Sequence, residues 1–200
     1  MSDLNKVATQ LTTVKESIQY QVEQGWVSVA RRVNSPHFNA RPYGEVSLLV
    51  VHNISLPAGC FGLPYIDHLF LGCLNCDDDM SFQALEGLKV SAHFLIRRDG
   101  ELVQYVSCDD RAWHAGVSMF EGRENCNDFA LGIELEGTDD IAYTDEQYCT
   151  LIALSNTLMK VYSKLNKERI VGHCDIAPKR KTDPGQSFDW KRYLTGVMSS

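Results

Sequence analysis

The stretch "SLLVVHN", residues 47–53, is a short, continuous apolar run that ends in a polar His-Asn pair. Its two adjacent valines favour a β-strand, and an unbroken apolar run of this length is typical of a strand that is covered on both faces. We therefore expect a buried strand here, with His52 at its carboxyl end.

Two further strand signals follow along the chain. Residues 90–106 contain two strand-like runs joined at Asp99-Gly100, which is a strong β-hairpin signal. In "FALGIELEG", residues 129–137, apolar residues alternate with small residues and carboxylates. This alternation puts Gly132 and Glu134 on one face of a strand, where the small residues leave room.

A helix and a last strand complete the pattern. Thr144 and Gln147 resemble a capping box, and the apolar residues after them keep a helical spacing to about Leu165. Residues 169–173, "RIVGH", are strand-like and again end in a histidine. The order of strand, hairpin, strand, helix and strand predicts an α/β fold with a mixed central β-sheet flanked by helices.

Two regions lie outside this pattern. Apolar residues between Leu4 and Val22 recur at steps of three and four, which predicts an amphipathic helix that ends near Gly25. We expect residues 1–24 to be an N-terminal helical extension that packs on the main domain, residues 25–200, or on a partner. Residues 57–88 show no sustained period and predict a long loop region with a short helix.

Composition excludes several classes of function. The 200 residues carry a net charge of -7, which argues against a nucleic-acid binder. There is no basic segment followed by an apolar run at the start, and no apolar run long enough to cross a membrane. The seven cysteines are an odd set and favour reduced thiols. We expect a cytoplasmic protein with no membrane and no nucleic-acid partner.

The stretch "GHCDIAPKRKTDPG", residues 172–185, brings a possible metal site. If the strands that end in His52 and His173 are adjacent and parallel, both imidazoles reach the same edge of the sheet. Asp183 would then complete a set of two histidines and a carboxylate, as in catalytic zinc sites with one position open for water. The spacing alone is a weak signal, and an ordinary surface loop is the alternative.

Two more side chains fit such chemistry. Glu134 could take a proton from water that attacks a carbonyl, although a solvated strand face would also explain it. Lys181 lies two residues before Asp183, so in an extended segment both point the same way and an ammonium would stand near a developing oxyanion. A solvated lysine is the alternative. We interpret His93, in an apolar strand, as a hydrogen-bonded core histidine.

Several motifs in the same order, among them "LLVVHNIS", "RAWHAGVS" and "GHCDIAPKRKTDPG", resemble the zinc-dependent N-acetylmuramoyl-L-alanine amidase family. The resemblance runs from about Gly25 to Trp190 and implies a fold like that of peptidoglycan recognition proteins. It also implies one Zn²⁺ per chain. The family's three zinc ligands, catalytic carboxylate and transition-state lysine correspond to His52, His173, Asp183, Glu134 and Lys181, respectively.

The resemblance further implies the reaction. We expect a monomer that hydrolyses the amide between the lactyl group of (1,6-anhydro)-N-acetylmuramic acid and L-alanine of the stem peptide, in cytosolic peptidoglycan recycling. Asn125 departs from several family members, which have a basic residue there. The candidates for binding the muropeptide substrate and its carboxylates are Asn53, Lys89, Trp113, Arg123 and Arg180.

Two other functions stay open on the sequence alone. An amidase that cuts intact wall peptidoglycan would need export, which the start of the chain does not favour. A non-catalytic muropeptide-binding module would keep the groove and lose the zinc site. The presence of all three ligands with Glu134 and Lys181 argues against that second alternative.

Overall fold

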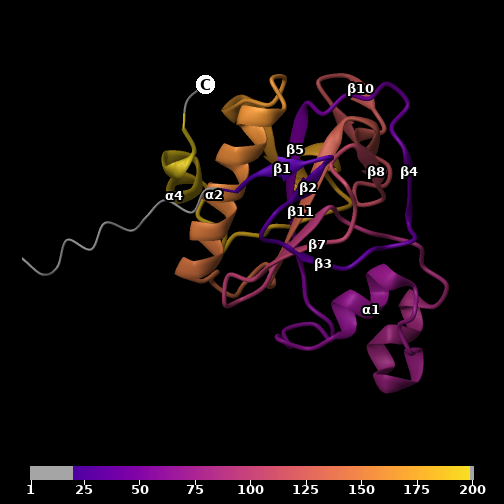
Figure 1. Cartoon of the computed structure of the whole chain (residues 1–200). Coiled ribbons are helices and arrows are strands. Elements are labelled where there is room, and N and C mark those ends of the chain that lie inside the picture. Colours follow the sequence, from indigo (N-terminus) through magenta and orange to yellow (C-terminus); the bar gives the residue numbers. More distant parts are fainter. Residues whose placement is uncertain (1–19, 199–200) are drawn as a thin grey trace, which may run out of the picture.

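A mixed six-stranded sheet crosses the middle of the molecule (Figure 1). The structure is a computed structural model that describes residues 20–198. Strands β5, β11, β12 and β6 run parallel, and β7 runs antiparallel to β6. In spatial order the strands are β12 (Ile170–Gly172), β5 (Leu48–Ile54), β11 (Ala130–Glu136), β6 (Phe94–Ile96), β7 (Leu102–Gln104) and β3 (Arg31–Arg32).

Strand β5 confirms the expectation drawn from residues 47–53. Its first four residues have no solvent exposure, and it pairs in parallel with β11 on one side and β12 on the other. Strand β11 is also a strand as predicted, but all seven of its residues are buried. The solvated-face alternative for Glu134 is therefore wrong, because the strand is covered on both faces.

The predicted hairpin and helix are both present. Strands β6 and β7 pair around Asp99-Gly100, where Gly100 takes a positive φ of 86°. Helix α2 (Asp145–Val161) begins with a capping box between Thr144 and Gln147. It ends at Val161, earlier than expected, because Tyr162 already has an extended backbone. No helix within residues 20–198 combines the length and the apolar character needed to cross a bilayer.

The two faces of the sheet are covered by different elements. Leucines of α2 pack on alternate residues of β5 and β11, such as Leu49 and Ile133, and α4 (Trp190–Gly196) joins the same core. On the opposite face, α1 (Tyr65–Leu71) packs against Leu95 and Val103. In Figure 1, α2 and α4 lie to the left of the sheet and α1 lies below it on the right. His52 follows the alternation of Leu48 and Val50, so it faces away from α2.

Short elements complete the fold. Two-stranded sheets form between β1 and β2, β4 and β8, and β9 and β10. The region of residues 57–88 contains one short α-helix and two 3-10 helices, in agreement with the expected loop region. The remaining bounds are β1 (Val22–Glu23), β2 (Trp26–Val27), β4 (Phe38–Ala40), η1 (Cys76–Asp78), η2 (Met80–Leu85), β8 (Asp110–Ala112), β9 (Met119–Phe120), β10 (Arg123–Glu124), η3 (Cys126–Asp128), η4 (Lys167–Arg169) and α3 (His173–Ile176).

The N-terminal helix prediction is wrong for the part of it that the structure describes. Val22 and Glu23 form β1 and pair with β2 through a turn at Gln24-Gly25, where both residues have positive φ. A Cβ at Gly25 would lie 2.1 Å from Ser107 Oγ, so the turn needs glycine there. Residues 1–19, which carry most of the predicted helix, lie outside the described residues, and the domain boundary after residue 24 stays a prediction.

Candidate active site

Three side chains meet at the carboxyl edge of the sheet. His52 ends the apolar run of β5, and His173 directly follows β12, which pairs with β5 in parallel. Asp183 arrives from the loop after α3. The two Nδ1 atoms lie 3.0 Å apart, and each lies 3.0 Å from Asp183 Oδ2. Within residues 20–198, these three form the only group of at least three histidine, cysteine or acidic side chains whose ligand atoms converge in this way.

The chemistry of these three groups fits a cation. His173 Nε2 lies 3.2 Å from the carbonyl oxygen of Ala115, which only accepts, so Nε2 carries the proton and Nδ1 offers a lone pair. Burial lowers the pKa of His52 to about 4, so that imidazole is neutral. Burial alone would raise the pKa of Asp183, but hydrogen bonds to both histidines hold it below its ordinary range. Two imidazoles and a carboxylate are ligands that zinc accepts.

Glu134 lies beside this group on the neighbouring strand. It pairs in register with His52, and only 8% of it is exposed. Its Oε2 atom is buried without a hydrogen-bond partner among the described residues. Burial raises the pKa of Glu134 well above its ordinary value, and the charge of Asp183 raises it further. A carboxyl group whose pKa is raised by burial holds a proton more readily than an exposed one, which suits it to proton exchange with a reacting group.

A groove of about 650 Å³ opens over these residues. We call the three converging side chains and Glu134 the floor of this groove. We call its apolar lining residues, which come largely from the region around α1 and η2, the apolar wall, and the lining residues just before Asp183 the polar wall. The apolar wall contains Leu56, Leu69, Phe70, Leu85, Leu88 and Val90, and the polar wall contains Arg180, Lys181 and Thr182.

Besides the three converging side chains and Glu134, four more of the predicted residues line this groove. Lys181 is exposed on the polar wall. Arg180 Nη2 donates to the carbonyl oxygen of Ala115 at 2.7 Å. Asn53 Nδ2 donates to Asp139 Oδ1 at 2.8 Å, so Asp139 orients this amide at the groove.

Trp113, the fourth of these residues, is fixed from two sides. Its ring stacks on that of His37 with centroids 5.9 Å apart, and its Nε1 donates to Asn39 Oδ1 at 2.7 Å. The indole is therefore held in one orientation on the wall of the groove.

The structure does not bring the other two predicted substrate contacts to the groove lining. Lys89 is exposed, between two residues that do line it. Arg123 Nη1 forms an ion pair with Glu45 at 2.8 Å, and its guanidinium packs over the ring of Phe129. Asn125 has a positive φ of 57° just before η3 and also lies outside the lining. The binding roles of Lys89 and Arg123 stay predictions.

A layer of side chains lies behind the site, and sequence reasoning missed the contact that His114 makes there. His114 Nδ1 lies 3.0 Å from His52 Nε2. The space that Gly132 leaves on β11 is filled by this ring, because a Cβ there would lie 2.5 Å from His114 Cγ. His93 is fully buried and its Nδ1 accepts from Gly132 N at 3.0 Å, which confirms it as a core histidine.

Arg41 is a residue that no sequence signal indicated. It is 7% exposed, and its guanidinium donates to the carbonyl oxygens of Cys108, Asn127 and Ala130 at 2.9 to 3.1 Å. Burial lowers its pKa to about 10. Since its donors are used on backbone carbonyls, Arg41 fixes the start of β11 against the segments beside it.

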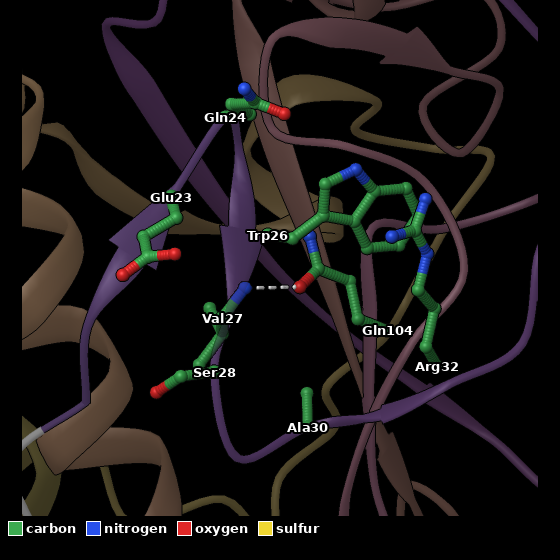
Figure 2. Close-up of a pocket in the computed structure, with 8 residues that line it drawn as sticks. All are labelled: Glu23, Gln24, Trp26, Val27, Ser28, Ala30, Arg32 and Gln104. Carbon is green, nitrogen blue, oxygen red and sulfur yellow. Dashed lines mark hydrogen bonds between the residues drawn. The ribbon is translucent and has the colours of Figure 1, made fainter.

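Figure 2 shows a second pocket, of about 480 Å³, beside the hairpin of β1 and β2. The Arg32 guanidinium lies 3.4 Å above the ring of Trp26. Gln104 is buried, accepts from Val27 N at 2.8 Å and donates to two carbonyl oxygens. The polar atoms of this buried glutamine are therefore paired within the protein and hold the hairpin against β7.

Comparison with known proteins identifies relatives of the whole fold. Residues 42–186 match the family described as N-acetylmuramoyl-L-alanine amidase. The chain is 58% identical over 180 residues to the 1,6-anhydro-N-acetylmuramyl-L-alanine amidase AmpD of Citrobacter freundii, covering 90% of this chain and 96% of that protein.

Solved structures agree with the sequence relatives. A crystal structure of a selenomethionine AmpD derivative matches with a TM-score of 0.87 and 56% identity, covering 89% of this chain and 99% of that one. The crystal structure of AmpDh3 from Pseudomonas aeruginosa in complex with anhydromuramic pentapeptide matches with a TM-score of 0.57 and 30% identity. That match covers 80% of this chain and 63% of the other.

Proposed function

The chain belongs to the N-acetylmuramoyl-L-alanine amidase family, and from this premise we propose that it is a zinc amidase of cytosolic peptidoglycan recycling. The bond cleaved is the amide between the lactyl group of (1,6-anhydro)-N-acetylmuramic acid and L-alanine of the stem peptide. The observation that carries the proposal is the convergence of His52, His173 and Asp183 beside Glu134 on the floor of one groove.

His52, His173 and Asp183 would hold the zinc ion, which would supply Lewis acidity to polarise a carbonyl and acidify water. Glu134 Oε2 accepts the proton of the attacking water as the new carbon–oxygen bond forms. It then passes this proton to the L-alanine nitrogen as the carbon–nitrogen bond breaks. Its burial supports this role, as does the lack of a hydrogen-bond partner for Oε2 among residues 20–198.

The remaining groove residues bind and orient the substrate. The Lys181 ammonium offsets the negative charge that develops on the carbonyl oxygen. Trp113 offers a fixed ring face to the sugar, and Arg180 adds positive charge on the polar wall. The apolar wall excludes water from one side of the scissile bond.

The names of the relatives and the cysteines support the proposed cellular setting. The related AmpD proteins are named for the 1,6-anhydro sugar. We also propose that the protein acts as a monomer. The cysteines that are free thiols, as expected in a reducing compartment, are Cys60, Cys73, Cys76, Cys108, Cys126 and Cys174.

The test is mass spectrometry of zinc-loaded protein incubated with anhydromuramyl-tripeptide. A chelator-treated sample and the Glu134→Gln variant are the controls. We expect free tripeptide from the zinc-loaded wild type alone. Release from intact peptidoglycan but not from anhydromuramyl-tripeptide would replace the recycling role with a wall-cutting one, and equal release after chelation would refute zinc dependence.

A further inference from the structure

The two histidines of the site differ in what holds their outer nitrogens. His173 Nε2 meets the main-chain carbonyl oxygen of Ala115, whereas His52 Nε2 meets a side chain, the Nδ1 atom of His114 at 3.0 Å. The two partners are neighbours in sequence. One short segment therefore contacts both imidazoles from behind the site.

This segment is itself fixed. The side chain of Asn127 is buried, and its Oδ1 accepts from the backbone N–H of His114 at 3.1 Å and from that of Ala115 at 2.8 Å. Gly132 provides the space for the His114 ring, since a Cβ there would lie 2.6 Å from His114 Nδ1. The position of the ring is thus determined by a glycine on one side and an amide clamp on the other.

The hydrogen-bonding rules of imidazole then determine the tautomer. A neutral imidazole has one N–H donor and one acceptor nitrogen. His52 can offer the Nδ1 lone pair to a metal only if its proton is on Nε2, and that proton needs an acceptor. His114 Nδ1 is within hydrogen-bond distance, and if it accepts there, the His114 proton lies on Nε2.

We propose that His114 is a positioning residue whose Nδ1 accepts from His52 Nε2–H and so holds His52 in the tautomer that binds metal. The inference rests on the proposed function, since it concerns the same metal site. Partners of this kind behind metal-binding histidines typically contribute about 10- to 100-fold to metal affinity.

The experiment compares zinc affinity, by competition with a chromogenic chelator, in the full-length wild type and three variants. His114→Leu keeps much of the volume and removes the acceptor. His114→Asn places Oδ1 near the position of Nδ1, whereas His114→Gln places its amide near the position of Nε2. The melting temperature of each metal-free protein shows whether weaker zinc binding comes from a destabilised fold or from the lost tautomer of His52.

We expect zinc affinity about 10- to 100-fold weaker in His114→Leu and His114→Gln, and within a few-fold of wild type in His114→Asn. If His114→Leu does not fold, the Asn and Gln pair makes the same comparison with two polar side chains. Wild-type affinity in His114→Gln, or equal weakening in Asn and Gln variants of equal metal-free stability, would overturn the inference alone. Absence of zinc from the wild type would overturn the proposed function itself.

Discussion

Two carboxylates on strand β11 have opposite surroundings, although both are buried. Glu136 Oε1 accepts from Gly62 N at 2.6 Å and from Arg97 Nη1 at 3.2 Å, and its Oε2 accepts from Arg98 N at 3.2 Å. Glu134, two residues earlier, has an Oε2 atom with no such partner in the described part of the chain. The paired carboxylate holds structure together, and the unpaired one is available for chemistry.

The contrast also explains how the groove is built. Arg97 connects Glu136 to the carbonyl oxygen of Leu63 and to Asp67 of α1. The region that forms the apolar wall is thereby tied to the same strand that carries Glu134. One strand thus supplies the candidate base and anchors the wall over it.

The largest expected effect is on turnover. Replacing Glu134 with Gln removes the proton acceptor and should lower turnover by about 10²- to 10⁴-fold. Zinc content and the melting temperature of the metal-free protein should not fall, because no hydrogen bond to Oε2 is lost. Steady-state assays with zinc analysis check this, and wild-type turnover in the variant would remove Glu134 from its role.

Retention of the metal should depend on Asp183. Asp183→Ala leaves two protein ligands. Zinc affinity should therefore fall by more than the roughly 10- to 100-fold typical of substitutions at side chains that only hydrogen-bond to a metal ligand. Glu136→Gln is the matched control, since it alters a buried carboxylate away from the ligands. Metal analysis after dialysis distinguishes them, and stoichiometric zinc in Asp183→Ala would contradict the assignment.

Stability should depend on Glu136 more than on Glu134. Glu136→Gln breaks a buried pair with Arg97 and replaces one acceptor oxygen by a donor, which should lower the free energy of unfolding by about 2 kcal/mol or more. Urea denaturation of the metal-free proteins measures this. A Glu134→Gln variant that is destabilised by the same amount would erase the contrast between the two carboxylates.

The smallest effect concerns a third carboxylate, the partly exposed Glu45. Hydrogen bonds from Ser47, Lys164 and Arg123, that of Ser47 first, lower its pKa to about 2 against the opposing effect of burial. Its contribution to stability is therefore present above its ordinary pKa and is lost as the pH falls toward 2. At pH 6 the free energy of unfolding of the metal-free wild type should exceed that of Glu45→Gln by no more than about 1 kcal/mol. This difference in the free energy of unfolding should be smaller at pH 3.

The central strands and the converging groups were accessible from the sequence. An unbroken apolar run with two valines, such as residues 48–51, is typical of a strand covered on both faces. Histidines at the ends of two such runs meet if the strands are parallel neighbours. The residue types and spacing suggested roles for Glu134 and Lys181 beside simpler alternatives, and the resemblance to a known family favoured those roles. The geometry brings the ligand side chains together, while the catalytic roles stay proposals.

The layer behind the site was not accessible in this way. His114 and His52 are separated by 62 residues, and Arg41 bonds to the carbonyl oxygen of Ala130 across 89. Such contacts depend on how loops cross over the sheet, which no local period encodes. The helix predicted from the spacing in residues 4–22 was wrong at its end for a different reason. The turn at Gln24-Gly25 places Val22 in a hairpin, whereas helical spacing alone would continue the helix.

The in-register pairing of β12 with β5 connects metal binding to folding. A slip of one residue between these strands would turn His52 or the chain before His173 to the other face of the sheet. An ion bound at the site would therefore stabilise only the native register of the two strands. It would also close a loop between residues 121 positions apart. By mass action, free zinc at about 100 times its dissociation constant would add about 2.7 kcal/mol to the stability of the correctly paired chain alone.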